Sequence, residues 1–129
     1  MVPRRALVAL LLAVPAILTS RALAAPGDLG GAIVVSAGGA TLGYTTKIAV
    51  EPQGTPLTFY DLDQLAHTVT AVDRDEDGAP LFDGSALPGG TSVIKGVDKL
   101  RAGSYQFFCS FHPNMTGTLL EVPVDRQLK

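Results

Sequence analysis

Three side chains that can bind a metal lie close together near the C-terminal end of the sequence. The segment FFCSFHPNM, residues 107–115, places two residues between Cys109 and His112 and two more between His112 and Met115. A tight loop can direct three such side chains to one point. Cys109 is the only cysteine of the chain, so it has no partner for an internal disulfide. An inert buried thiol, an intermolecular disulfide and a metal-bound thiolate are the three explanations for such a cysteine.

The fourth candidate ligand is His67, the only other histidine of the chain. A thiolate, two imidazoles and a thioether form the ligand set of trigonal copper with a weak axial methionine. Zinc fits this set less well, because structural zinc sites favour several thiolates and a thioether is a poor ligand for zinc. Each side chain taken alone is explained equally well as a buried histidine, a core thiol or a methionine that fills a gap. The joint spacing favours copper over zinc and over a site without metal.

The first 24 residues, MVPRRALVALLLAVPAILTSRALA, have the pattern of a secretory signal peptide. Two arginines precede an apolar run, and an A-x-A cleavage signal ends at Ala24. A membrane anchor needs about 20 apolar residues, and Pro15 interrupts this run. We therefore expect residues 1–24 to be removed on export and residues 25–129 to form one domain. The expected location is periplasmic or secreted, with no membrane span after cleavage.

The charge of the remaining chain argues against one class of partner. Three of the ten basic residues lie in the signal peptide and none of the twelve acidic residues does, so residues 25–129 carry a formal charge of −5. Binding to nucleic acid depends on basic surface. We therefore expect no nucleic acid partner.

Short apolar stretches separated by turn residues make up the chain from residue 30 onward. These stretches are AIVVSA, KIAV, PLTFY, HTVTAV, TSVI, SYQFFC and TGTLLEV. No amphipathic helical run of useful length is present. This pattern is typical of an antiparallel sandwich or barrel. Of the two, we expect an all-β Greek-key β-sandwich of about seven to eight strands.

Two of these strands can be phased, because side chains alternate between the two faces of a strand. In SYQFFC one face carries Tyr105, Phe107 and Cys109, and in HTVTAV one face carries His67, Val69 and Ala71. Apart from the candidate ligands and the tyrosine, these faces are apolar, so we expect them to face the core.

The start of the SYQFFC strand has the pattern of a tyrosine corner. In LRAGSY, the spacing of Leu100, Gly103 and Tyr105 resembles the motif in which a tyrosine hydroxyl returns to the backbone at the start of a strand. We therefore expect Tyr105 to bond back to the preceding segment.

Two segments together, YDLDQLAHTVTAV and LRAGSYQFFCSFHPNMTGTLL, resemble the cupredoxins, the small blue copper proteins that include plastocyanin and amicyanin. The resemblance extends from about Gly31 to Val122. It implies that an early histidine and a late cysteine, histidine and methionine hold one type 1 copper per chain. These positions are His67, Cys109, His112 and Met115. The spacing of the late loop is most similar to that of amicyanin.

The resemblance also implies a function. It predicts an exported protein that shuttles single electrons between redox partners by cycling copper between Cu(I) and Cu(II). The partners are expected to dock near His112, Phe111 and Pro113 on a monomer. We expect no enzyme activity, because both histidines are already ligands and none remains for a second copper centre. The alternative function with the same ligands is periplasmic copper binding and delivery.

Two positions depart from the pattern of the family. Thr68 follows the first histidine where the family commonly has an asparagine that ties the ligand loops together, and Ala66 precedes it where a proline is common. A hydroxyl replaces the amide only in part, so we expect weaker bracing of the ligands.

The segment DRDEDG, residues 73–78, has the acidic spacing of a calcium loop. Position twelve of that loop would be Gly84 instead of glutamate, and no helices are predicted on either side. We therefore expect a solvated acidic turn that does not bind calcium.

Overall fold

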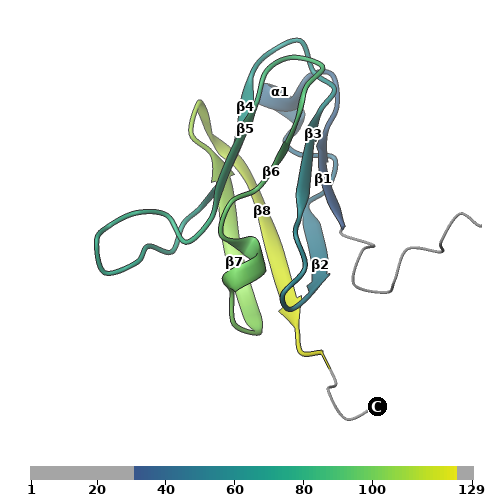
Figure 1. Cartoon of the computed structure of the whole chain (residues 1–129). Helices are drawn as coiled ribbons and strands as arrows, with labels where there is room; N and C mark the ends of the chain where they lie inside the picture. The colour runs from purple at the N-terminus through teal and green to yellow at the C-terminus, as the bar shows by residue number, and fades with distance from the viewer. Residues whose placement is uncertain (1–30, 125–129) are drawn as a thin grey trace, which may run out of the picture.

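The computed structural model describes residues 31–124, which form two β-sheets packed face to face (Figure 1). One sheet has three strands, in the order β1-β3-β6, and the other has five, in the order β2-β8-β7-β4-β5. The strands of the first sheet are β1 (Ala32–Val35), β3 (Thr58–Asp61) and β6 (Thr91–Val93). The strands of the second sheet are β2 (Ile48–Pro52), β8 (His112–Val122), β7 (Gly103–Cys109), β4 (His67–Ala71) and β5 (Asp83–Ala86). The predicted β-sandwich and its number of strands are confirmed.

The predicted signal peptide, residues 1–24, lies outside the described residues. Within the described residues there are two short helices, α1 (Gly39–Leu42) and the 3-10 helix η1 (Val97–Lys99). Neither is long and apolar enough to cross a membrane, and residues 31–124 contain no other helix.

Aromatic and branched side chains from both sheets fill the space between them. The ring of Phe107 on β7 meets the ring of Tyr44 edge-on, with centroids 5.0 Å apart and an interplanar angle of 75°. Gly117 lies opposite Phe107 on β8, and a Cβ atom there would come within 2.2 Å of the Phe107 ring. A side chain at this position would therefore displace the ring, which explains the glycine in the middle of a long strand.

The predicted phases of the two strands are confirmed. Along β7, Phe107 and Cys109 are buried and Tyr105 is half-buried, while Gln106 between them is exposed. All five residues of β4 are buried, including His67. The predicted tyrosine corner is also present, since the Tyr105 hydroxyl donates a hydrogen bond to the carbonyl oxygen of Arg101 at 2.7 Å.

Every apolar stretch identified in the sequence contains a strand, but one strand lies outside these stretches and another begins before its stretch. The segment DGSA forms β5, although aspartate, glycine and serine disfavour strands. Gly84 packs closely against Ile94 there, since a Cβ atom would lie 3.0 Å from a side-chain carbon and 3.2 Å from the Cα atom of Ile94. The apolar stretch TGTLLEV begins at Thr116, whereas β8 begins at His112. Pairing with β7 extends this strand into the ligand segment, down to the pair Cys109 and His112.

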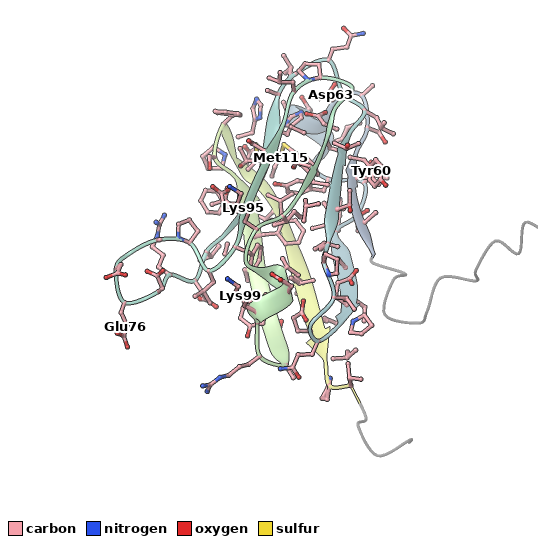
Figure 2. The ribbon with its side chains drawn as sticks, viewed as in Figure 1. Tyr60, Asp63, Glu76, Lys95, Lys99 and Met115 are labelled. Atoms are coloured by element: carbon pink, nitrogen blue, oxygen red, sulfur yellow. The ribbon has the colours of Figure 1, made fainter. Side chains whose placement is uncertain are left out.

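The acidic segment 73–78 forms the expected turn, in a connection between β4 and β5 that projects from the sandwich with Glu76 at its tip (Figures 1 and 2). The Asp75 carboxylate accepts hydrogen bonds from the backbone N–H groups of Asp77 and Ala79, both at 2.9 Å. Arg74 donates to the Gly78 carbonyl at 2.8 Å. These local bonds account for the shape of the turn. That it does not bind calcium stays a prediction.

Candidate metal centre

Three of the four predicted ligands meet at one end of the five-stranded sheet. His67 is the first residue of β4, Cys109 is the last residue of β7, and His112 is the first residue of β8. The Cys109 Sγ atom lies 3.8 Å from His67 Nδ1 and 3.7 Å from His112 Nδ1. The three ligand atoms all lie within 4.8 Å of one another. In each imidazole the Nδ1 atom is the one nearest the sulfur, so both rings present the same nitrogen to a common point.

The turn between β7 and β8 explains how Cys109 and His112 come together. The two residues are paired across the strands, and the pairing register shifts between Phe108 and Cys109, which marks a bulge. Such a bulge changes the direction of a side chain at the end of a ladder. The turn leaves Phe111 61% exposed at its tip, while Cys109 is fully buried.

Met115 lies three residues beyond His112 on β8 and is 1% exposed. Buried and exposed residues alternate along this part of the strand, and Met115, Gly117 and Leu119 are the buried ones. The methionine therefore points between the sheets, in the upper half of the sandwich as seen in Figure 2. Asp63, which lies 2.7 Å from the ring of His67, is labelled in the same half.

The surroundings of Cys109 favour the thiolate form of its side chain. Burial alone would raise the pKa of its thiol. The backbone N–H of Thr68 lies 3.4 Å from the sulfur and, together with His67 and His112, lowers the pKa to about 7. Because the thiolate is the form that binds metals, this environment favours ligation over an inert core thiol.

The hydroxyl of Thr68 connects the two segments that carry the ligands. It accepts a hydrogen bond from the backbone N–H of Ser110 at 2.8 Å, and it lies 2.9 Å from the hydroxyl of Thr70. Thr70 in turn contacts the Ser110 hydroxyl at 3.1 Å and donates to Asp83 at 2.7 Å. Three hydroxyls, those of Thr68, Thr70 and Ser110, thus form the contact between the two ligand segments. That they brace the ligands less firmly than an asparagine stays a prediction.

Two buried residues next to the ligands were missed in the sequence. The Tyr44 hydroxyl donates to the backbone carbonyl of Thr68, and burial raises the pKa of this phenol above its ordinary value. The Asp63 carboxylate lies 2.7 Å from His67 Nε2. The spacing of Asp63 and His67, four residues apart, is a weak signal in a loop, and Tyr44 is 23 residues from His67. Only the packing of the loops identifies these contacts.

The donor set fits copper. One thiol with a lowered pKa and two Nδ1 atoms face one another in a buried space, and a buried thioether follows on the same strand. Sulfur and imidazole ligands in a trigonal arrangement with a weak axial thioether are characteristic of copper electron-transfer sites. A structural zinc site would favour a set richer in thiolates.

No family model matches the chain, and no curated protein matches it. Solved structures do resemble it. A purple cupredoxin from Nitrosopumilus maritimus superposes with a TM-score of 0.58 at 22% identity, over 71% of this chain and 99% of that one. Amicyanin from Paracoccus versutus superposes with a TM-score of 0.56 at 18% identity, over 72% and 81% of the two chains. A Cu(I) structure of an amicyanin mutant gives a TM-score of 0.54 at 25% identity, over 71% and 83%.

These likenesses cover 71% and 72% of this chain and most of the length of the two solved structures. The implied fold is thereby confirmed: the chain has the fold of the cupredoxins.

Proposed function

We propose that this protein carries single electrons by means of one copper ion held by His67, Cys109, His112 and Met115, and that it is not an enzyme. The observation that supports this most directly is the convergence of two imidazole Nδ1 atoms on Cys109 Sγ, at 3.8 and 3.7 Å. Bound copper would supply a one-electron couple between Cu(I) and Cu(II). The protein's part is to hold the ligands in one arrangement for both oxidation states.

The surroundings of the ligands can hold them in one arrangement for both oxidation states. His67 and Cys109 lie on strands of one sheet, and sites on strands are positioned more rigidly than sites on loops. The sulfur accepts a hydrogen bond from the Thr68 N–H, and the Thr68 hydroxyl ties the Cys109 segment to β4. Little movement is then needed when the metal changes its charge.

His112 is the proposed route by which electrons enter and leave. Its side chain is partly exposed, whereas the other three ligands are at most 1% exposed. Phe111 is 61% exposed beside it, and Pro113 is exposed on the other side. A redox partner that docks over this edge comes close to a ligand without opening the site.

Further apolar side chains surround this end of the sandwich. They extend from α1, the β3–β4 connection and the β5–β6 turn, which lie at the same end as the start of β4 (Figure 1). We call this set, together with Phe111, the apolar rim; its exposed members are Leu42, Leu62, Leu65, Leu87 and Phe111. Partners of electron carriers form small, transient contacts, and an apolar rim around a partly exposed ligand suits such a contact on a monomer.

The predicted signal peptide supports an exported location, periplasmic or secreted. The same ligands would also serve in copper delivery, which requires release of the metal. The hydrogen bonds that hold the thiol and the ligand segments favour retention.

Titration of the protein with Cu(II) tests the proposal. We expect one equivalent to produce an intense visible band from charge transfer between thiolate and copper, and we expect Cys109→Ser to remove it. A colourless one-to-one complex would contradict the copper site. Repeated reduction and reoxidation beside a moderate Cu(I) chelator then separates the two functions, because an electron carrier keeps its copper and a delivery protein loses it.

A further inference from the structure

The ring of His67 is held between a thiol and a carboxylate. Its Nδ1 atom faces Cys109 Sγ at 3.8 Å, and its Nε2 atom lies 2.7 Å from Asp63 Oδ2. The His67 side chain is 0% exposed and the Asp63 side chain 6% exposed. The two ring nitrogens therefore have different partners, and water reaches neither pairing freely.

Backbone N–H groups from two segments hold the Asp63 carboxylate in place. Oδ1 accepts from Gly38 at 3.1 Å and from Gln64 at 2.8 Å, and Oδ2 accepts from Gly39 at 3.1 Å. The hydrogen bond to His67 and these N–H groups lower the pKa of Asp63 to about 2. Within residues 31–124 no lysine or arginine forms an ion pair with Asp63. The carboxylate is thus buried, held by three backbone N–H groups and directed at one imidazole nitrogen.

The two glycines make this approach possible. Gly38 has a φ of +85°, a conformation that other residues rarely adopt. A Cβ atom on Gly39 would lie 3.3 Å from both Asp63 Oδ2 and His67 Nε2, and only 2.3 Å from a methyl carbon of Val35. The start of α1 therefore packs against the Asp63–His67 contact, which is built into the fold.

We propose that Asp63 is a positioning residue of the metal site, which orients His67 for copper and lowers the reduction potential. Its carboxylate accepts a hydrogen bond from Nε2–H and so selects the tautomer that leaves the Nδ1 lone pair free toward Cys109. A carboxylate on the outer nitrogen fixes the ring and makes it a stronger donor. An additional negative charge near the ligands favours Cu(II) over Cu(I). The effect on the potential rests on the proposed copper site, whereas the choice of tautomer does not.

The tautomer is tested on the metal-free wild-type protein. Long-range ¹H–¹⁵N NMR spectra, recorded at a pH where the ring is neutral, report which nitrogen of His67 carries the proton. We expect Nε2–H with a bare Nδ1. A ring protonated at Nδ1 would overturn the proposal. This measurement needs no substitution, so it decides the matter even if an Asp63 variant does not fold.

The effect on copper is tested with Asp63→Asn, which keeps the shape of the side chain and removes its charge. Loss of an outer-shell partner typically costs 10- to 100-fold in metal affinity. If the variant loses this affinity for Cu(II) and keeps its affinity for Cu(I), the reduction potential rises by about 59 to 118 mV. A tenfold change in the affinity ratio corresponds to about 59 mV for one electron. Asp98→Asn is the control, because it removes the same charge from an exposed residue of η1. Equal potentials for the two variants would overturn the proposal.

The two experiments also separate this inference from the proposed function. If the wild-type protein forms no coloured copper complex, the copper site fails and with it the effect on the potential. The NMR result then still decides whether Asp63 orients the ring. If the copper complex forms but both variants behave alike, the copper site stands and the role of Asp63 fails.

Discussion

Glu51 and Glu121 face each other on the neighbouring parallel strands β2 and β8, at the same register position, and both are buried between the sheets. Glu51 is 0% exposed and Glu121 is 3% exposed. The Thr55 hydroxyl donates to Glu51 at 2.8 Å, but within residues 31–124 neither carboxyl oxygen of Glu121 has a hydrogen-bond partner. Burial, together with the charge of Glu51, raises the pKa of Glu121 from 4.5 to about 7. The pair lies at the end of β8 remote from the ligands.

This pair predicts that the protein becomes less stable as the pH rises from about 4.5 to about 7. In that window the folded state keeps a proton on Glu121 that the unfolded chain has already released, so the free energy of unfolding falls with rising pH. The contribution of one such group is on the order of 1 to 3 kcal/mol. Denaturant unfolding at several pH values measures it. Glu121→Gln should remove this part of the slope and stabilise the protein above pH 7.

Glu76→Gln is the matched control, because Glu76 is exposed in the β4–β5 connection. It should leave the slope of the wild type unchanged. If Glu121→Gln and Glu76→Gln gave parallel curves, the proposed protonation of the pair would be wrong.

The hydroxyl of Thr68 yields a second prediction. Thr68→Ala removes the acceptor of the Ser110 N–H and one member of the hydroxyl network. We expect a loss of about 1 to 3 kcal/mol in the free energy of unfolding, since the change removes several hydrogen bonds that each contribute about 0.5 to 1.5 kcal/mol. Thr118→Ala should cost less, because the Thr118 hydroxyl bonds the exposed Gln106 side chain. Equal losses for the two variants would show that Thr68 does not brace the ligand segments.

Met115 is expected to tune the potential without being essential for the colour. An axial ligand of type 1 copper is long and weak, and it affects the potential more than the trigonal plane. Met115→Gln should keep the visible band and lower the potential by roughly 59 mV or more, which corresponds to a tenfold preference for Cu(II). Voltammetry and visible spectra check both parts. Complete loss of copper binding, or an unchanged potential, would exclude Met115 as the axial ligand.

The apolar rim predicts where partners dock. Phe111→Glu should slow electron exchange with a redox partner about tenfold or more while the visible spectrum stays the same, because Phe111 is exposed and is not a ligand. Val50→Glu is the control, since Val50 is 56% exposed on β2, opposite Leu120 and far along β8 from His112. Stopped-flow kinetics with one partner protein compares the two variants. Equal rates would place the docking surface elsewhere.

Much of the fold and of the ligand set could be predicted because both depend on patterns of residues that are close together in the sequence. Alternation of apolar residues identified the strands, and the fixed spacing of Cys109, His112 and Met115 pointed to one loop. His67 followed by elimination, as the only other histidine. These signals depend on neighbours along the chain.

The features that the sequence did not predict depend on contacts between distant segments. Gly84 occupies a strand because it packs against Ile94, and no local preference indicates this. β8 begins at His112 because β7 offers a pairing partner there, although Pro113 and Asn114 suggest a loop. Asp63 contacts Gly38 and Gly39, about 25 residues earlier in the chain. Such contacts are decided by how the loops pack.

The ladder between β4 and β7 consists of only two pairs, Thr70 with Phe108 and Ala71 with Phe107. On the ligand side of these two pairs the ladder does not continue. The N–H of Thr68 donates to the Cys109 sulfur, and the N–H of Ser110 donates to the Thr68 hydroxyl. At this end of the sheet, a sulfur and a hydroxyl take the place of two carbonyl oxygens, and the gap between the strands is closed by side chains. Cys109 therefore also holds β4 and β7 together, through the same sulfur atom that it offers to the metal.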